Sequence, residues 1–255
     1  MGISAHSPGQ GIAEVVMDVP PVNALTVQGW FDLADAVRAA GRDPANRVVV
    51  LRAEGRGFNA GVDLKEMQAA RGFEALVGAN RGCYAAFAAV YACEVPVIAA
   101  VHGFCLGGGV GLAGNADIVI ASDDAYFGLP EVERGALGAA THLARLVPQH
   151  LMRAMVYTCR NVTAAELHAF GSVLKVVTRD ELRDAAFEVA RQIASKSPTV
   201  IRAAKESLNG IDLWDVNRSY RFEQGFTFEL NLTGVADDLR DDFVADKSDG
   251  THDDA

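Results

Sequence analysis

Glycines are concentrated between residues 103 and 114, in the stretch GFCLGGGVGLAG, and a glycine-rich turn before a helix can bind an anion through its backbone N–H groups. Gly109, Gly111 and Gly114 match the spacing of a dinucleotide-binding fingerprint. That fingerprint needs a strand directly before its first glycine and a full helix after its last. The expected strands end near 101 and begin again near 117, which leaves no room for that helix. No Lys-Ser or Lys-Thr pair follows the glycines, so a P-loop is excluded as well.

The triplet Gly107, Gly108 and Gly109 suits a different use at the start of a short helix. Free N–H groups point outward there, and glycine lets the backbone approach a ligand closely. Such donors stabilise an oxyanion that forms during a reaction. The alternative is structural, with the glycines allowing a helix and a strand to touch.

Acidic side chains follow in the stretch PEVERG, where Glu131 is the first candidate for general acid–base chemistry and Glu133 the second. A carboxylate at Glu131 could instead simply pair with Arg134. His142 lies in an expected helix close behind, as a possible acid–base partner or as a buried structural group.

Strands and helices must position these groups, and the hydrophobic pattern predicts an α/β fold. Beta-branched runs predict strands, and apolar residues at helical spacing predict helices. The strand at 95–103 has no polar alternation, as expected when both faces of a sheet are covered. Thr26 is a candidate N-cap for the first helix. The predicted strands are 11–18, 47–54, 95–103, 117–122, 125–128 and 172–177; the helices are 26–40 and 73–92, and the chain is mostly helical after 140.

The composition is that of a globular protein of 255 residues, with 50% hydrophobic residues and a net charge of -10. An acidic balance argues against nucleic acid and anionic membranes as partners. No apolar stretch reaches the ~20 residues of a membrane span. Four cysteines without a CxxC pair indicate neither a metal site nor disulfides, which favours the cytoplasm. The polar tail at 245–255 is expected to be frayed.

Three segments, in order, resemble the crotonase, or enoyl-CoA hydratase/isomerase, superfamily: RGFNAGVDLKEM (56–67), VHGFCLGGGVGLAGNADIVIAS (101–122) and FGLPEVERGALG (127–138). The resemblance implies a crotonase-like spiral of ββα units over residues 1–195. It also implies a helical oligomerisation region over 196–244, and a homotrimer or a dimer of trimers.

Site roles come with the same resemblance. The backbone N–H groups of Val62 and Gly108 would form an oxyanion hole for the thioester oxygen of an acyl-CoA substrate. Ala60, Leu64 and Lys65 would line the groove for coenzyme A. No cofactor is implied beyond the coenzyme A of the substrate itself.

Gly111 departs from the hydratase pattern. Hydratases similar to this chain carry a glutamate there and a second one at the position of Glu131. Glycine cannot transfer a proton, so two-carboxylate hydration is in doubt. A single carboxylate beside an oxyanion hole suits enolate chemistry, and the missing side chain is expected to open room for a bulkier substrate.

GFNAGVDLKEM, the segment 127–155 and RSYRFEQGFTFELNL are similar to one actinobacterial branch of the family. That branch opens the last carbocycle left from the steroid C and D rings, on a bicyclic carboxyl-CoA. The resemblance implies hydrolytic C–C ring opening in steroid (cholesterol) degradation. Glu131 would activate water to attack a ring ketone β to the thioester, and the released electrons would form an enolate in the oxyanion hole.

Two other functions remain open. An enoyl-CoA isomerase or hydratase would act on fatty-acid-type substrates, with Glu131 moving a proton. A non-catalytic acyl-CoA-binding scaffold would bind the thioester without turnover. Aromatic residues at 220, 222, 226 and 228 are expected to pack mostly in the core, with lining of a neighbouring subunit's pocket as the alternative.

Overall fold

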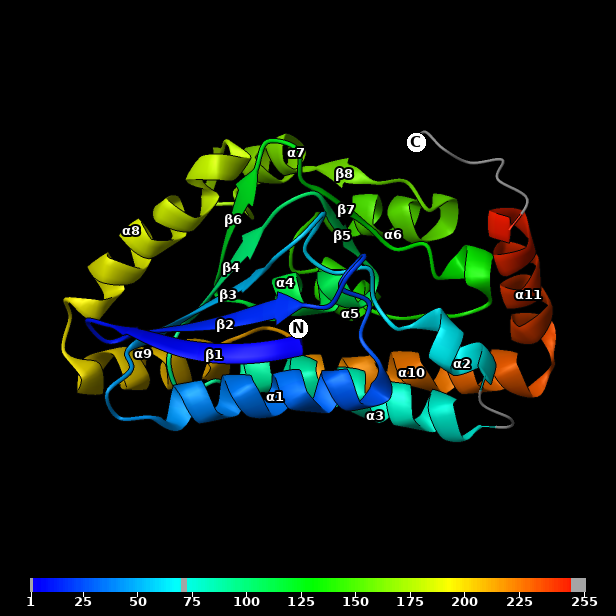
Figure 1. The fold of residues 1–255 in the computed structure, drawn as a ribbon, viewed down its shortest axis with the longest axis horizontal. Coiled ribbons are helices and arrows are strands. Elements are labelled where there is room, and N and C mark those ends of the chain that lie inside the picture. The colour runs from blue at the N-terminus through cyan, green and yellow to red at the C-terminus, as the bar shows by residue number, and fades with distance from the viewer. Residues whose placement is uncertain (1, 70–72, 249–255) are drawn as a thin grey trace.

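A six-stranded sheet forms the centre of the molecule (Figure 1), in a computed structural model that describes residues 2–69 and 73–248. The strand order is β1-β2-β3-β4-β6-β9. Neighbouring strands are parallel except for β1 and β2, which are antiparallel. The strands are β1 (Gly2–Gly9), β2 (Ile12–Asp18), β3 (Val48–Ala53), β4 (Val97–Val101), β6 (Ile118–Ser122) and β9 (Lys175–Val177).

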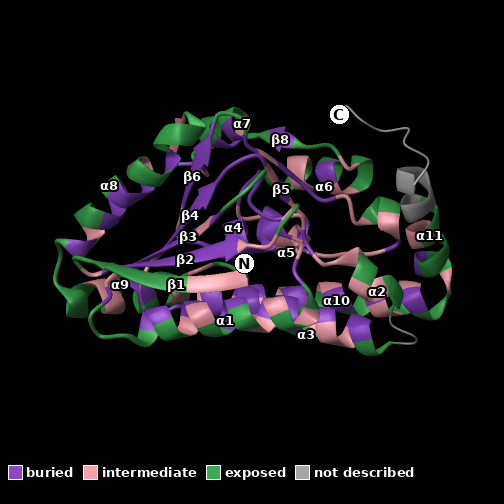
Figure 2. Cartoon of the chain, in the orientation of Figure 1, coloured by how far each residue is buried: buried purple, intermediate pink, exposed green. Residues whose placement is uncertain are grey.

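Helices cover both faces of this sheet. α1 (Val27–Arg42) and α3 (Glu74–Tyr91) pack on one face, and α8 (Leu182–Ala194) packs on the other. In β3, Val49 and Leu51 point to the α1 side, whereas Val48 and Val50 point to α8. β4 is therefore buried along its whole length, and β3 is buried except at Arg52 (Figure 2), which explains why their sequences are almost entirely apolar.

A second, three-stranded sheet places the site. It contains β5 (Phe104–Leu106), β7 (Tyr126–Gly128) and β8 (Val162–Thr163). β4 lies in the large sheet and β5 in the small one, before α4 (Gly108–Asn115), and β6 and β7 repeat this change of sheet. The chain thus has the ββα repeat that the resemblance implies. A single bridge between Asn59 and Cys105 adds the first glycine loop to the edge of the small sheet.

The part of the chain after 140 is mostly helical, as predicted. The remaining helices are α2 (Leu64–Ala69), α5 (Ala140–Leu143), α6 (Gln149–Thr158), α7 (Ala164–Ala169), α9 (Pro198–Gly210), α10 (Val216–Leu232) and α11 (Val235–Ser248). α9 and α10 follow one another through the lower part of the view in Figure 1, and α11 stands at the right-hand end, away from the large sheet. α11 continues past residue 244, and residues 249–255 of the expected tail lie outside the described residues. None of the described helices is long and apolar enough to cross a membrane.

Most predicted elements are confirmed, including the N-cap at Thr26, whose side chain accepts from the Gly29 N–H at 3.1 Å. The aromatic residues of α10 require a correction. Tyr220 is buried, but the exposed fractions of Phe222 and Phe226 are 71% and 41%. The prediction of core packing is therefore wrong for these two residues, because they lie on the outer face of their helix.

Candidate active site

The first glycine loop is held rigidly by Asn59, which is fully buried. Its carboxamide oxygen accepts from the Gly61 N–H at 2.8 Å, and its backbone carbonyl accepts from the Leu106 N–H at 2.9 Å. Gly61 accepts from the Leu25 N–H at 2.9 Å and has a φ of +88°, a conformation that favours glycine. These contacts fix the backbone that presents Val62.

The second glycine loop lies directly against the first. A Cβ atom on Gly61 would be 3.3 Å from the nitrogen of Gly108, and a Cβ atom on Gly108 would collide with the ring of Trp30 at 2.6 Å. Neither the Val62 N–H nor the Gly108 N–H donates to another residue within 2–69 and 73–248. Both residues line one pocket. Two free N–H groups at one place are what an oxyanion hole needs.

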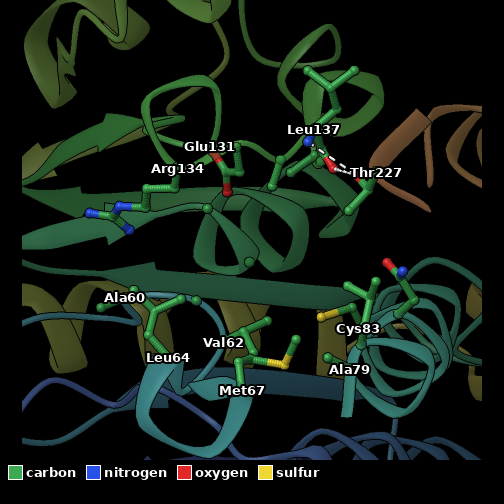
Figure 3. A pocket seen from close by; sticks show the side chains of 18 of the residues that line it. Ala60, Val62, Leu64, Met67, Ala79, Cys83, Glu131, Arg134, Leu137 and Thr227 are labelled. Atoms are coloured by element: carbon green, nitrogen blue, oxygen red, sulfur yellow. Dashed lines mark hydrogen bonds between the residues drawn. The ribbon is translucent and has the colours of Figure 1, made fainter. Parts of the chain in front are cut away.

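Glu131 enters the same pocket from the segment that follows β7. Pro130 precedes it, and a one-turn 3-10 helix over Val132–Arg134 follows it. Its carboxylate contacts Gly107 so closely that any side chain there would collide with it. Figure 3 shows Glu131 on one wall of the pocket, opposite Ala60 and Val62. Among the described lining residues, Glu131 is the only acid.

Burial controls the charge of Glu131. Its Oε2 atom is shielded from solvent and has no hydrogen-bond partner among the described residues. Burial raises the pKa of Glu131 to about 8, the Arg134 guanidinium acts to lower it, and the Glu223 carboxylate acts to raise it. A base or acid with a pKa near neutrality is well matched to proton transfer at physiological pH.

A phenyl ring occupies the place where hydratases carry their other glutamate. A Cβ atom on Gly111 would collide with the ring of Phe87, which comes from α3 and lines the pocket. The expectation that Gly111 opens room for a bulkier substrate is therefore wrong at this point, because Phe87 fills the space. An apolar wall replaces the second carboxylate.

His142 lies behind this wall and does not line the pocket. Its ring is 4.9 Å from that of Phe87 and 4.7 Å from that of Tyr220, and it is 1% exposed. Its Nδ1 accepts from the Asn115 carboxamide at 3.0 Å. Burial lowers the pKa of His142 to about 3, so the ring is neutral at physiological pH. The geometry supports a buried structural group rather than an acid–base partner.

Two further predicted residues also lie outside the pocket. Glu133 is exposed. Together with burial, its negative charge raises the pKa of the nearby Cys159 thiol. Lys65 is exposed in the first turn of α2, whereas Ala60 and Leu64 line the pocket. The structure brings Glu131, Val62, Gly108, Ala60 and Leu64 together, and leaves Glu133, Lys65 and His142 apart.

Sequence motifs did not reveal the wall that α3 and α10 contribute. Leu76, Asn80, Cys83 and Phe87 all line the pocket, and their helical spacing places them on one face of α3. Asn80 is the polar residue on this otherwise apolar stripe, which was a signal available in the sequence. Tyr220, Thr227 and Arg240 reach the pocket from the C-terminal helices. Of these, only Tyr220 belongs to a pattern noted in the sequence, the aromatic residues at 220, 222, 226 and 228.

The described residues contain no group of three or more His, Cys, Asp or Glu side chains placed to hold a metal ion. The site combines two N–H donors and one buried carboxyl group with a mostly apolar wall, to which Asn80, Arg134 and Arg240 add polar and charged side chains. Such an arrangement can stabilise an enolate and move a proton next to it.

Comparisons with known proteins agree with this chemistry. The family model for enoyl-CoA hydratase/isomerase matches residues 7–222. A (7aS)-7a-methyl-1,5-dioxo-2,3,5,6,7,7a-hexahydro-1H-indene-carboxyl-CoA hydrolase of Rhodococcus jostii is 66% identical, over 96% of this chain and 95% of its own length. A protein of the same name from Mycobacterium tuberculosis is also 66% identical, over 96% of this chain and 99% of its own.

The fold has relatives among solved structures. The crystal structure of an enoyl-CoA hydratase/isomerase from Xanthobacter autotrophicus has a TM-score of 0.83 and 28% identity, and the match covers 90% of this chain and 87% of that one. The α/β crotonase fold expected from the motifs is confirmed by this likeness. The chain belongs to the enoyl-CoA hydratase/isomerase family.

Proposed function

We propose that this protein hydrolyses a carbon–carbon bond in the acyl ring of a bicyclic dioxo-indene carboxyl-CoA. The names of the two relatives at 66% identity support this substrate. A fused five- and six-membered carbocycle with an angular methyl group has the skeleton of the steroid C and D rings. The proposed place of the reaction is therefore the degradation of steroid rings.

The reaction begins with water, which loses a proton to ionised Glu131 and attacks a ring ketone. The tetrahedral adduct collapses to a carboxylic acid, and the adjacent ring C–C bond breaks. Its electron pair moves into the conjugated thioester, whose enolate oxygen accepts from the N–H groups of Val62 and Gly108. The proton on Glu131 is available for the enolate carbon, and the product is a ring-opened acyl-CoA with a new carboxylate. The thioester itself accepts the electrons, so no further cofactor is needed.

One observation carries this proposal: the pocket holds a single carboxyl group, and Phe87 stands where a second one would be. Two carboxylates are what the resemblance assigns to hydration, and one is enough for water-assisted cleavage. The raised pKa of Glu131 makes its carboxylate a stronger base than an exposed glutamate.

The same proposal covers the coenzyme A contacts, the cellular compartment and the assembly of subunits. Ala60 and Leu64 would contact the pantetheine of coenzyme A at the mouth of the pocket, and exposed Lys65 would meet a phosphate. We place the enzyme in the cytoplasm because its four cysteines are all free thiols. Residues 1–195 would form the catalytic core, and the helices within 196–244 would join it to other subunits as a trimer or a dimer of trimers.

The test is incubation with the bicyclic dioxo-indene carboxyl-CoA in ¹⁸O-labelled water, followed by mass spectrometry. The proposal expects a mass gain of one water, with the label in the new carboxylate. Glu131→Gln should bind the thioester and lose turnover by about a hundredfold to ten-thousandfold, as expected when a required base is removed. No mass gain with the wild-type enzyme would sink the proposal.

An isomerase is the second candidate, because a lone carboxyl group beside an oxyanion hole can also carry a proton between two carbons. A 3-enoyl-CoA converted to its 2-enoyl isomer, without uptake of water, would favour it. A scaffold would show binding without turnover for both the wild-type protein and Glu131→Gln.

A further inference from the structure

Asn80 has a carboxamide that nothing in the described part of the protein satisfies. Its Nδ2 atom is shielded from solvent and has no hydrogen-bond partner among the described residues. Buried polar groups in native proteins are normally hydrogen-bonded, so an orphan donor calls for an explanation. Asn80 lines the same pocket as Glu131, which places this donor where an acyl group would bind.

The backbone of Asn80 is fixed by the neighbouring helix. Its carbonyl accepts from the Gln224 carboxamide at 2.8 Å, and Gln224 is 1% exposed on α10. Leu76, Ala79 and Cys83 lie around it on α3 and line the same pocket. A donor held in an apolar wall is suited to recognise one acceptor atom of a ligand.

The hydrogen-bond acceptor oxygens of the proposed substrate would bind at different places in the pocket. The N–H groups of Val62 and Gly108 take the thioester oxygen, which leaves the two ring ketones. Figure 3 shows Ala79 and Cys83, the α3 neighbours of Asn80, on a different side of the pocket from Glu131. A ketone oxygen near α3 would therefore meet Asn80.

We propose that the Asn80 carboxamide donates a hydrogen bond to a ring ketone of the acyl group and makes the enzyme specific for oxo-substituted bicycles. This inference rests on the proposed function, because it requires the dioxo bicycle as substrate. A straight acyl chain has no oxygen at this place and would leave the donor unpaired. Sites built to bond a polar substrate group discriminate strongly against analogues that lack it.

The experiment measures dissociation constants in the Glu131→Gln background, where binding is separated from turnover. The ligands are the dioxo-indene carboxyl-CoA and its two mono-oxo analogues, which lack one ketone each. Asn80→Leu, which is close in size but has no donor, should raise the dissociation constant of the dioxo thioester about tenfold. The dissociation constant of the mono-oxo analogue that keeps the bound ketone should rise by a similar factor. That of the analogue lacking this ketone should stay unchanged.

Cys83→Ala is the matched control, because Cys83 lines the same pocket one turn along α3. It should change the affinities of the three thioesters by equal factors. If Asn80→Leu also changes all three equally, or changes none, the inference is overturned while the proposed function stands. If the wild-type enzyme does not hydrolyse the dioxo thioester, the proposed function and this inference fail together.

Discussion

Glu131 combines two properties that rarely occur together on a free carboxyl group. Its Oε2 atom lacks a partner within the described residues, yet it faces a pocket that a substrate can enter. Burial raises the pKa of the carboxyl group to about 8. Because Oε2 has no partner among the described residues, it is available to accept a hydrogen bond from a water molecule. Burial therefore makes the carboxylate more basic, and the missing partner leaves it free to activate water.

The first prediction concerns the pH dependence of kcat/KM. The base must be ionised in the free enzyme, so kcat/KM should rise with pH and level off above about 8. Arg134→Gln removes a charge that lowers the Glu131 pKa and should move the midpoint upward. Glu223→Gln removes a negative charge that raises the Glu131 pKa, so it should move the midpoint of the profile to lower pH. A profile unaffected by both variants would show that another group titrates.

A second prediction concerns stability. The pKa of Glu131 is about 8 in the folded state and 4.5 for an ordinary glutamate, so the folded state holds more protons between these values. Stability from this residue is present below pH 4.5 and is lost as pH rises towards 8, by up to about 1.4 kcal/mol per pH unit. Glu131→Gln has no such loss.

Urea unfolding at a series of pH values checks this. The free energy of unfolding of Glu131→Gln minus that of the wild-type protein should grow from pH 5 to pH 8 and then stay constant. Other titrating groups cancel in the difference. A difference that does not change with pH would mean that Glu131 is not buried as described.

The third prediction tests the ring of Phe87 as the replacement for a carboxylate. Gly111→Glu alone should destabilise the protein by about 1–3 kcal/mol, because its side chain collides with that ring. It should not add water to a 2-enoyl-CoA. The double variant Phe87→Ala/Gly111→Glu makes room and should hydrate measurably faster than either single variant. Equal rates for the double variant and Phe87→Ala would contradict this account.

At the scale of elements, α10 holds the wall that faces the substrate. The Thr227 hydroxyl accepts from the Leu137 N–H at 3.0 Å and donates to the Leu137 carbonyl at 2.5 Å (Figure 3). The Glu223 carboxylate accepts from the N–H groups of Ala140 and Thr141 at 2.9 and 3.0 Å. A C-terminal helix thereby fixes the loop between Glu131 and α5.

Thr227→Val is the fourth prediction. The substitution keeps the size of the side chain and removes both hydrogen bonds to Leu137, so it should cost about 1–3 kcal/mol in unfolding free energy. Because Leu137 lines the pocket, KM should rise as well. Thr233→Val is the control: this residue is exposed at the end of α10, and its hydroxyl donates to the Leu230 carbonyl of the same helix. An unchanged KM in Thr227→Val would show that the pocket wall at Leu137 keeps its position without these two hydrogen bonds to α10.

Elements with strong local signals could be predicted from the sequence, and tertiary pairings could not. Strands β3 and β4 were predictable because both their faces are apolar. β1 was missed because GISAHSPG has few β-branched residues, and the strand exists through its pairing with β2. The glycine loops and Glu131 carry motifs, whereas Phe87 is 24 positions from Gly111 and nothing near either residue signals their contact.

At the scale of the whole molecule, the C-terminal helices leave much apolar surface exposed. Within the described part of α9 to α11 and their connections, the large exposed apolar residues are Val200, Leu208, Ile211, Leu213, Trp214, Phe222, Phe226, Leu232 and Val235. Contiguous exposed apolar patches on soluble proteins mark sites of protein–protein contact. Tyr220 and Thr227 of α10 and Arg240 of α11 line the pocket. A subunit packed against α10 and α11 would therefore also stabilise this wall of the active site.

The fifth prediction is that these helices join subunits. The mass in solution should be at least three times the 27.0 kDa of one chain, by light scattering after gel filtration. Phe222 is 71% exposed and stacks edge-on against Phe226 at 5.2 Å, so Phe222→Asp should place a charge in the contact and lower the mass. Leu174→Asp, which alters an exposed leucine outside these helices, should keep the assembly. Because α10 fixes the pocket wall, the dissociated Phe222→Asp protein should also show a raised KM. Dissociation by Leu174→Asp but not by Phe222→Asp would place the interface elsewhere.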